Sequence, residues 1–215
     1  MHPFRRDGKN PCSPEDHLQK KSRIAKERDP QRRQDFQKEV EAIDAKDLVF
    51  LDESGFSLSL YQHDGWAPEG ERLIEAVPCN RGKNLSVLGA LDIEGMLCTR
   101  QKLGAIKRED VEVFLSEDVL PRLLPGSVIV LDNARIHPGG KIEKIVEEAG
   151  CKLLYLPPYS LDFWPIKPAW GWIKHRVRQR CPRDDKSRVA AIKESVAALP
   201  AEFAPNWFRN CGVQC

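Results

Sequence analysis

Short apolar runs alternate with longer amphipathic stretches along most of this chain. Runs that are continuously apolar, or that alternate between apolar and polar residues, are typical of β-strands. They predict strands at residues 48–51, 72–77, 85–93, 97–103, 127–131 and 152–156. Gly95 separates the third and fourth of these runs. A glycine between two such runs favours a hairpin, because it tolerates the backbone angles of a tight turn.

Apolar residues spaced three or four positions apart predict the helices. Phe36, Val40 and Ile43 show this spacing near the start of the chain. The predicted helices cover residues 31–43, 107–123, 139–149, 166–180, 185–199 and 201–210. The order runs from strands with hairpins, through alternating helices and strands, to helices alone. This order predicts an α/β fold, a mixed sheet flanked by helices on both faces.

Composition places the chain among globular proteins of one domain or of one domain with an appendage. It has 215 residues, with 41% hydrophobic and 31% charged, which is neither a disordered nor a fibrous composition. No apolar run approaches the roughly 20 residues of a membrane helix. The first residues carry arginines without an apolar core behind them, so no secretory signal is predicted and we expect a cytoplasmic protein.

Two carboxylates follow buried apolar runs that are far apart in the sequence. Asp52 comes directly after the run at 48–51, and Asp132 directly after the run at 127–131. Sites in open α/β sheets form outside the strand ends, where loops converge. Two carboxylates that meet there repel each other unless a cation such as Mg²⁺ neutralises them. The alternative is that each aspartate only ends its strand, because Asp is common in turns.

Four segments resemble, in order, the catalytic motifs of mariner-type transposases and their bacterial insertion-sequence relatives. They are LDESG at 51–55, GWAPEGER at 65–72, VLDNARIH at 130–137 and LPPYSLDFWPIKPAW at 156–170. The resemblance covers roughly residues 18–212. It implies a ribonuclease-H-like fold and DNA cleavage followed by strand transfer, with two Mg²⁺ or Mn²⁺ ions. The implied partners are double-stranded DNA, both transposon ends and target, and a second copy of the chain, acting in a bacterial cytoplasm.

The same resemblance assigns the site residues. Asp52 and Asp132 correspond to the first two catalytic, metal-binding acids. The third acid would stand at residue 167, separated from Asp132 by the 34 residues of 133–166. Phosphate contacts with DNA are expected from the two basic clusters, although either could be an ordinary solvated helix face. The cluster residues are Lys20, Lys21, Arg23, Lys174, Arg176 and Arg178.

The third motif departs from the family pattern at three positions. Leu161 replaces a proline, Trp164 an asparagine and Lys167 the catalytic glutamate. An ammonium group cannot ligate a metal, and it puts a positive charge where a cation should sit. We therefore expect an impaired transposase catalytic domain, or alternatively a non-catalytic DNA-binding or dimerisation remnant. Metal binding could persist in two ways: Lys167 could swing out to solvent, or another acid, such as Asp162 or Glu53, could supply the third ligand.

Domain organisation and several aromatic positions complete the expectations. Residues 1–44 are predicted to form a basic arm and linker helix, the remnant of a junction to helix-turn-helix modules, and 45–215 the catalytic domain. Trp170 is expected in the core, and Trp164, at a polar family position, on the surface. Trp66 could stack on a base or pack over the sheet. His137 could contact a phosphate or bond locally.

Overall fold

The fold is a five-stranded sheet between two layers of helices. The computed structural model describes residues 25–60, 65–74, 76, 82–132 and 140–214. The strands are β1 (Leu48–Phe56), β2 (Leu85–Asp92), β3 (Gly95–Leu103), β4 (Val128–Leu131) and β5 (Lys152–Tyr155). The helices are α1 (Pro30–Glu41), α2 (Arg108–Val113), α3 (Lys141–Glu148), α4 (Ile166–Arg180), α5 (Asp185–Ala197) and α6 (Ala204–Asn210). Shorter turns are η1 (Ala45–Asp47), η2 (Phe114–Val119), η3 (Leu120–Arg122), η4 (Leu161–Phe163) and η5 (Ala201–Phe203).

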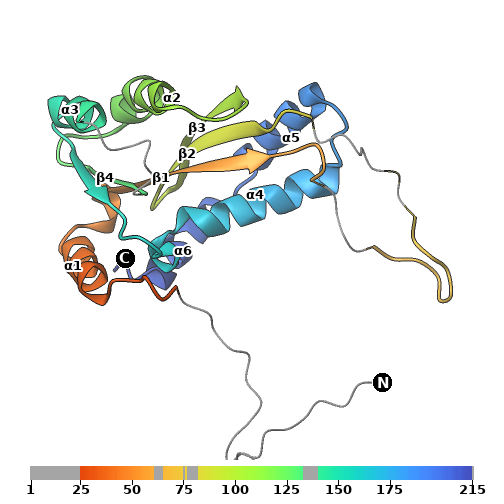
Figure 1. Cartoon of the computed structure of the whole chain (residues 1–215), viewed down its shortest axis with the longest axis horizontal. Helices are drawn as coiled ribbons and strands as arrows, with labels where there is room; N and C mark the ends of the chain where they lie inside the picture. Colours follow the sequence, from red (N-terminus) through yellow and green to blue (C-terminus); the bar gives the residue numbers. More distant parts are fainter. Residues whose placement is uncertain (1–24, 61–64, 75, 77–81, 133–139, 215) are drawn as a thin grey trace, which may run out of the picture.

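The sheet is mixed, with strand order β3-β2-β1-β4-β5 (Figure 1). β1, β2 and β3 are antiparallel neighbours, whereas β4 runs parallel to β1 and β5 parallel to β4. The β2–β3 turn is closed by Asp92, whose Oδ1 accepts from the backbone N–H of Glu94 and of Gly95. Gly95 has φ +131°, which an L side chain rarely adopts, so the turn requires glycine here.

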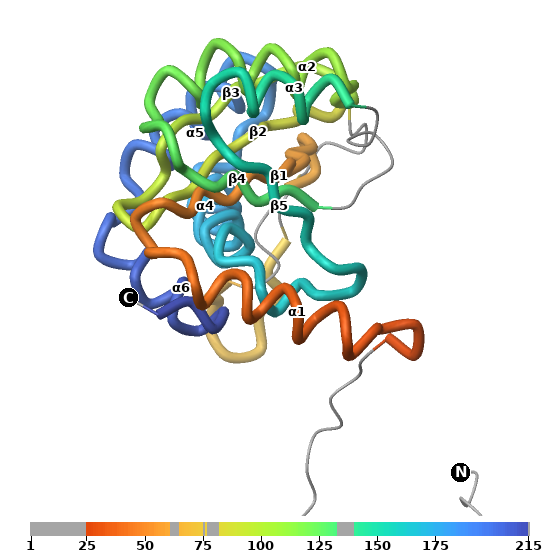
Figure 2. Tube along the Cα trace, turned by 90° about the vertical axis from the view of Figure 1, so that its left-hand side faces the viewer, coloured from red at the N-terminus to blue at the C-terminus, as the bar shows by residue number. Residues whose placement is uncertain are grey.

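Alternation along the strands divides the core into two layers. Leu48, Phe50 and Phe56 of β1 face the layer that contains α1, α4, α5 and α6. Val49 and Leu51 face the opposite layer, formed by α2, η2 and α3. The two layers lie on opposite faces of the sheet in both cartoon views (Figures 1 and 2). The mixed sheet with helices on both faces, expected from the sequence, is confirmed.

Three elements differ from the sequence-based expectations. β1 continues to Phe56 instead of ending before Asp52, because its antiparallel partner β2 extends the pairing to Leu85. The strand predicted at 72–77 is wrong for the described residues 72–74 and 76, which have no strand pairing. The helix predicted at 107–123 is helical throughout 108–122, but its winding changes from α-helix to π-helix at Phe114 and then to a 3₁₀ turn.

A buried arginine fixes the far end of β1. Arg188 of α5 is fully buried, and its guanidinium donates to the carbonyl oxygens of Phe56 and Lys83 at 2.9 and 3.1 Å. Its Nη2 also contacts Asp185 at 2.6 Å. These bonds hold together the end of β1 and the approach to β2, which flank the connection that contains the GWAPEGER segment.

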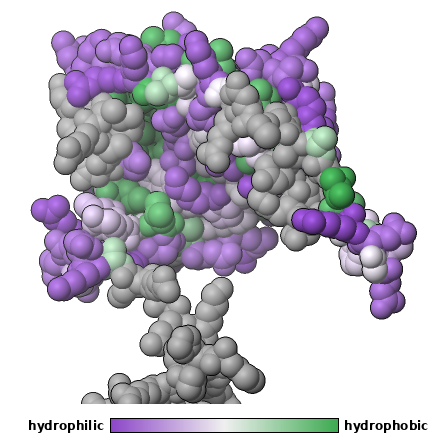
Figure 3. All heavy atoms as spheres, turned by 45° about the vertical axis from the view of Figure 1, so that its right-hand side comes forward, coloured by the Kyte–Doolittle hydropathy of each residue, from purple (hydrophilic) through white to green (hydrophobic). Residues whose placement is uncertain are grey.

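On the face shown in Figure 3, the described residues are mostly hydrophilic, with small apolar patches between them. Within the described residues, none of the helices combines the length and apolar character that crossing a membrane demands. The segment 65–74 projects from the body (Figure 1), and its Trp66 side chain is 100% exposed. The alternative in which Trp66 packs over the sheet is therefore wrong.

Candidate active site

Strand register brings the two predicted acids to one place. β1 and β4 pair in parallel with Phe50 opposite Val130, so Asp52 and Asp132 stand two residues further along adjacent strands. Phe50 and Val130 belong to the core layer under α4. Because side chains repeat every two residues along a strand, both carboxylates emerge on that same side of the sheet. Their predicted placement on neighbouring strands is thus observed, with Asp52 inside β1 rather than beyond its end.

Both carboxylates line one cavity of about 310 Å³ together with Lys167. Apolar side chains of β1, β2, β4 and the segment at the start of α2 also line it, beside the polar residues Glu53 and Asn84. The Asp52 side chain is only 5% exposed, so little water reaches its charge. Ionised side chains in the cavity therefore interact more strongly with one another than they would in water.

Lys167 points into this cavity and binds the first acid. Its Nζ donates to both carboxylate oxygens of Asp52, at 2.9 Å to Oδ1 and 2.7 Å to Oδ2. The Asp52 side chain is only 5% exposed, whereas that of Lys167 is 40% exposed. Lys167 is the second residue of α4, where the helix dipole disfavours a cation. The ion pair with Asp52 offsets that unfavourable position. The alternative in which Lys167 swings out to solvent is therefore wrong.

Burial raises the pKa of Asp52 above its ordinary value. The ammonium of Lys167 lowers this pKa by its charge and by its hydrogen bonds, and the nearby Asp132 charge raises it again. The indole N–H of Trp164 also lowers it, although this nitrogen lies outside full hydrogen-bond geometry. Burial is the largest of these effects, so the pKa of Asp52 stays above its ordinary value even with the ammonium of Lys167 beside it.

A family model described as DDE superfamily endonuclease matches residues 47–189, about two thirds of the chain and all the elements that carry this cavity. The chain belongs to this family. No curated protein matches it at a significant level.

Solved structures of Mos1 mariner transposase share the fold of this DDE domain. The Mos1 strand transfer complex aligns with a TM-score of 0.70 and 17% identity, covering 91% of this chain and 63% of the Mos1 chain. The catalytic domain of Mos1 mariner transposase gives a TM-score of 0.63 at 15% identity, covering 84% and 87% of the two chains. The DDE domain thus spans less than two thirds of the chain in the full complex. The likeness confirms the ribonuclease-H-like fold.

The residues at the cavity do not fit a two-metal centre. Within the described part of the chain, three or more metal-ligating side chains come together nowhere. Asp162 does not supply a third carboxylate to the cavity. It is bound by Arg28, just before α1, and by Arg33 of α1, and it does not line the cavity. Glu53 lines the cavity but forms no such cluster with Asp52 and Asp132. We derive no chemical step through a metal.

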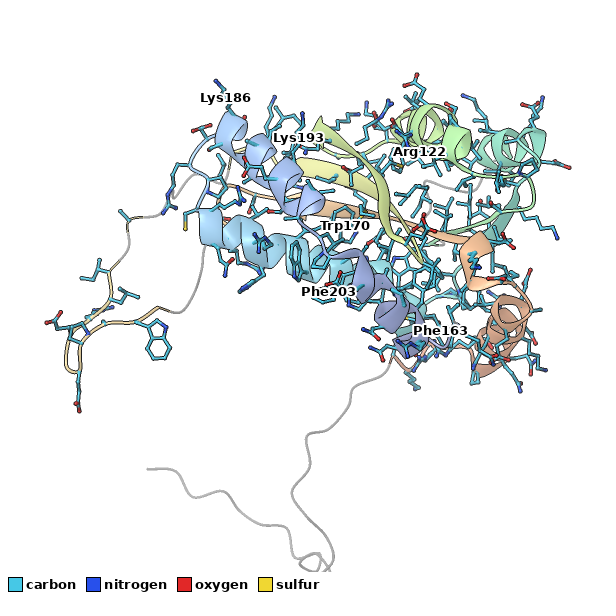
Figure 4. All side chains as sticks on the ribbon, turned by 180° about the vertical axis from the view of Figure 1, so that it is seen from behind. Arg122, Phe163, Trp170, Lys186, Lys193 and Phe203 are labelled. Carbon is cyan, nitrogen blue, oxygen red and sulfur yellow. The ribbon has the colours of Figure 1, made fainter. Side chains whose placement is uncertain are left out.

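The substituted third motif is packed, not loose. Trp164 is 1% exposed and its ring meets Phe50 edge-to-face at 5.7 Å, so the expectation of a surface tryptophan is wrong. Trp170 is in the core, as expected, and lies between α4 and the sheet (Figure 4). The loop therefore accommodates Trp164 by burying its aromatic side chain against β1, whereas Leu161 is 64% exposed.

The expected DNA contacts fall partly on α4. Lys174 lies about two turns after Lys167 on α4, and Arg178 lies about one turn after Lys174. Burial lowers the pKa of Lys174, and the charges of Arg178 and Lys167 add to this effect. Arg176 stacks on Trp172 at 5.0 Å. The structure brings these residues together with the cavity on one helix. Outside the described residues lie Lys20, Lys21, Arg23 and His137.

Proposed function

We propose that this chain is a transposase-type DDE catalytic domain in which metal-dependent DNA cleavage and strand transfer are impaired by Lys167. The observation that carries the proposal is the ion pair between Lys167 and Asp52, which places an ammonium against the first acid. Replacing a carboxylate by an ammonium changes the local charge by two units. Each unit is worth about 4 kcal/mol at ~4 Å and an effective dielectric near 20.

The roles that support this proposal follow from the residues at the cavity. Asp52 and Asp132 are proposed as the two acids that a divalent ion would use, with Lys167 at the position of the third. Mg²⁺ and Mn²⁺ accompany the Mos1 paired-end complexes, in which transposon ends are bound. Asp52 and Asp132 would hold such an ion only if the charge of Lys167 were removed, and the ion would then supply electrostatic stabilisation at a phosphodiester. An ammonium on Asp52 opposes its binding.

The test compares three proteins in one assay. Supercoiled plasmid is incubated with Mg²⁺ or Mn²⁺ and the original chain, Lys167→Glu or Lys167→Met. Lys167→Met removes the ammonium without adding a ligand, so it separates the two effects of the glutamate. We expect Lys167→Glu alone to bind Mn²⁺ in calorimetric titration and to nick the plasmid. Its restoration is expected to be partial, because Leu161 and Trp164 also depart from the family motif.

Thermal unfolding gives an independent measure of the same proposal. Three acids at one cavity repel one another, so Lys167→Glu is expected to melt below the original chain in chelator and to gain stability as Mn²⁺ is added. The original chain is expected to melt at the same temperature in both conditions. Metal-dependent nicking by the original chain at the rate of Lys167→Glu would overturn the proposal.

A second candidate function is a non-catalytic DNA-binding or dimerisation protein derived from a transposase. Two features favour it: the basic residues of α4, and the projecting segment 65–74, where Trp66 and Ile74 are 100% and 83% exposed. Leu73 of the same segment is also 57% exposed, and contiguous exposed apolar surface marks interaction sites. We propose that the chain forms a homodimer through this segment and binds double-stranded DNA. In this assignment residues 1–44 form a basic arm and linker helix, ahead of the catalytic domain at 45–215.

Analytical ultracentrifugation of the original chain and of Trp66→Ser/Ile74→Ser tests the dimer. A dimer that becomes a monomer in the double variant supports the second function. The matched control is Leu124→Ser, since Leu124 is 78% exposed but lies away from this segment, before β4. A monomer at all concentrations excludes the dimer.

A further inference from the structure

The carboxylate of Asp162 is held by two arginines from the start of the described chain. Arg28 Nη2 donates to both oxygens at 2.6 Å, and Arg33 donates through Nη1 at 3.1 Å and Nη2 at 2.7 Å. Burial raises the pKa of Asp162, but the hydrogen bonds and charges of Arg33 and Arg28 outweigh it and leave the pKa below its ordinary value. Asp162 is therefore an anion bound by two cations, in charge-assisted geometry.

Phe163, the residue after Asp162, packs against α1, the helix that carries Arg33. The guanidinium of Arg33 lies 3.9 Å from the centre of the Phe163 ring, and Phe36 stacks on that ring at 5.7 Å with an interplanar angle of 20°. Phe163 lies in the region where η4 meets α1 (Figure 4). Two consecutive residues of η4 are thus fixed by α1, one through charge and one through packing.

Backbone bonds continue this connection into α4. The N–H of Phe163 donates to Ser160 O at 2.9 Å, that of Trp164 to Leu161 O at 3.2 Å, and that of Lys167 to Trp164 O at 3.1 Å. With Trp164 buried against β1, the turn has few ways to move without also moving the first turn of α4. Residue 167 stands in that first turn, at the edge of the carboxylate cavity.

We propose that Asp162 is a positioning residue: bound to Arg28 and Arg33, it sets where residue 167 stands relative to Asp52. The proposal rests on the proposed function only in taking residue 167 as the position that decides the chemistry of the cavity. The entry of the chain into α1 and the helix that carries residue 167 are tied through one carboxylate. Removing its charge leaves the fold intact, because the Asp162 side chain is 54% exposed, but releases the turn.

Hydrogen exchange on the whole protein tests the connection directly. Asp162→Asn keeps the size of the side chain and removes its charge. We expect amide exchange in residues 161–167 to quicken on the order of tenfold, with exchange in β2 and β3 unchanged. Asp162→Glu, which restores the charge, is expected to recover most of the protection. Asp35→Asn is the matched control, since Asp35 lies on α1 and accepts from Gln31 without contacting η4.

A second measurement reads the effect at the cavity. In the Lys167→Glu background, adding Asp162→Asn is expected to weaken Mn²⁺ binding about threefold to tenfold, and adding Asp35→Asn to leave it unchanged. If Lys167→Glu binds no Mn²⁺, the proposed function fails and exchange alone decides the positioning role. Exchange in 161–167 that is unchanged in Asp162→Asn, or that rises equally across the chain, overturns the positioning role.

Discussion

The Nζ of Lys167 lies 2.9 and 2.7 Å from the two carboxylate oxygens of Asp52, across the cavity edge between α4 and β1. The pair joins a half-exposed cation to a carboxylate whose burial raises its pKa. The ammonium of Lys167 lowers the pKa of Asp52 that burial raises, and the carboxylate offsets the unfavourable position of a lysine at a helix N-terminus. A lysine at position 167 is therefore accommodated without opening the fold.

The strength of this pair is measurable by a double-mutant cycle. Lys167→Met is expected to lower the free energy of unfolding by about 1–3 kcal/mol, because it leaves Asp52 buried beside Asp132 without its cation. The coupling energy between Lys167→Met and Asp52→Asn is expected to be about 1–2 kcal/mol in urea denaturation. The control cycle uses Lys144 and Glu148, an exposed pair on α3 at 3.7 Å, where coupling should stay below about 0.5 kcal/mol. Equal coupling in the two cycles would contradict this account.

The Asp162 cluster gives the protein a defined acid sensitivity. The folded-state pKa of Asp162 lies below its ordinary value of 3.8, so its ion pairs stabilise the fold fully above that value and are lost as pH falls through the folded pKa. The difference in unfolding free energy between the original chain and Asp162→Asn should thus be constant from pH 7 to about 5 and shrink below about 4. A difference that grows on acidification contradicts the sign of the shift.

Gly89 of β2 stands opposite Asp52 and beneath Trp170. A Cβ at Gly89 would lie 2.6 Å from the Trp170 ring, a distance at which the ring or the strand must move. Gly89→Ala is therefore expected to destabilise the fold by about 1–3 kcal/mol. Gly171→Ala is the matched control on α4, where nothing lies within 4 Å, and should stabilise by about 0.5–1 kcal/mol. Thermal unfolding of both variants decides, and equal melting temperatures would refute the packing argument.

DNA binding is expected to depend on phosphate contacts and hence on salt. Affinity for a duplex should fall steeply between low and physiological salt. Lys174→Gln/Arg178→Gln should weaken binding and reduce the slope of log affinity against log salt by about 1–2. Lys193→Gln, which changes an exposed lysine on α5, should leave both unchanged. Fluorescence anisotropy across a salt series measures this, and a slope unaffected by the α4 variants would rule out their phosphate contacts.

The sequence predicted most elements because their signals are local. The run at 48–51 and the spacing of apolar residues in 166–180 each identify their element without knowledge of the rest. The position of Asp52 inside β1 was not predictable from its own neighbours, since the strand is prolonged by pairing with β2. The prediction of a surface position for Trp164 was wrong for a similar reason. Whether a residue after a turn is buried depends on the residues it packs against, and Trp164 packs against Phe50, which is distant in the sequence.

The Asp162 cluster lay beyond sequence reasoning altogether. Arg28 and Asp162 are separated by 134 positions, and neither stands in a periodic pattern that reports a partner. Resemblance to the family could mark Asp162 as part of a motif but could not say what it contacts. The roles of Asp52, Asp132 and Lys167 in chemistry stay predictions, to be decided by the metal-binding and nicking experiments.

Because Lys167 is covalently part of the chain, the local concentration of its ammonium beside Asp52 does not fall when the protein is diluted. A tethered group acts on its neighbour at an effective concentration on the order of millimolar or more, whatever the surrounding solution contains. A divalent ion entering the cavity has to compete with that permanent occupant, whereas a site of acids alone recruits its cation from the medium. The positive charge at this cavity is therefore encoded in the sequence, and we expect it to be present at any concentration of divalent ions.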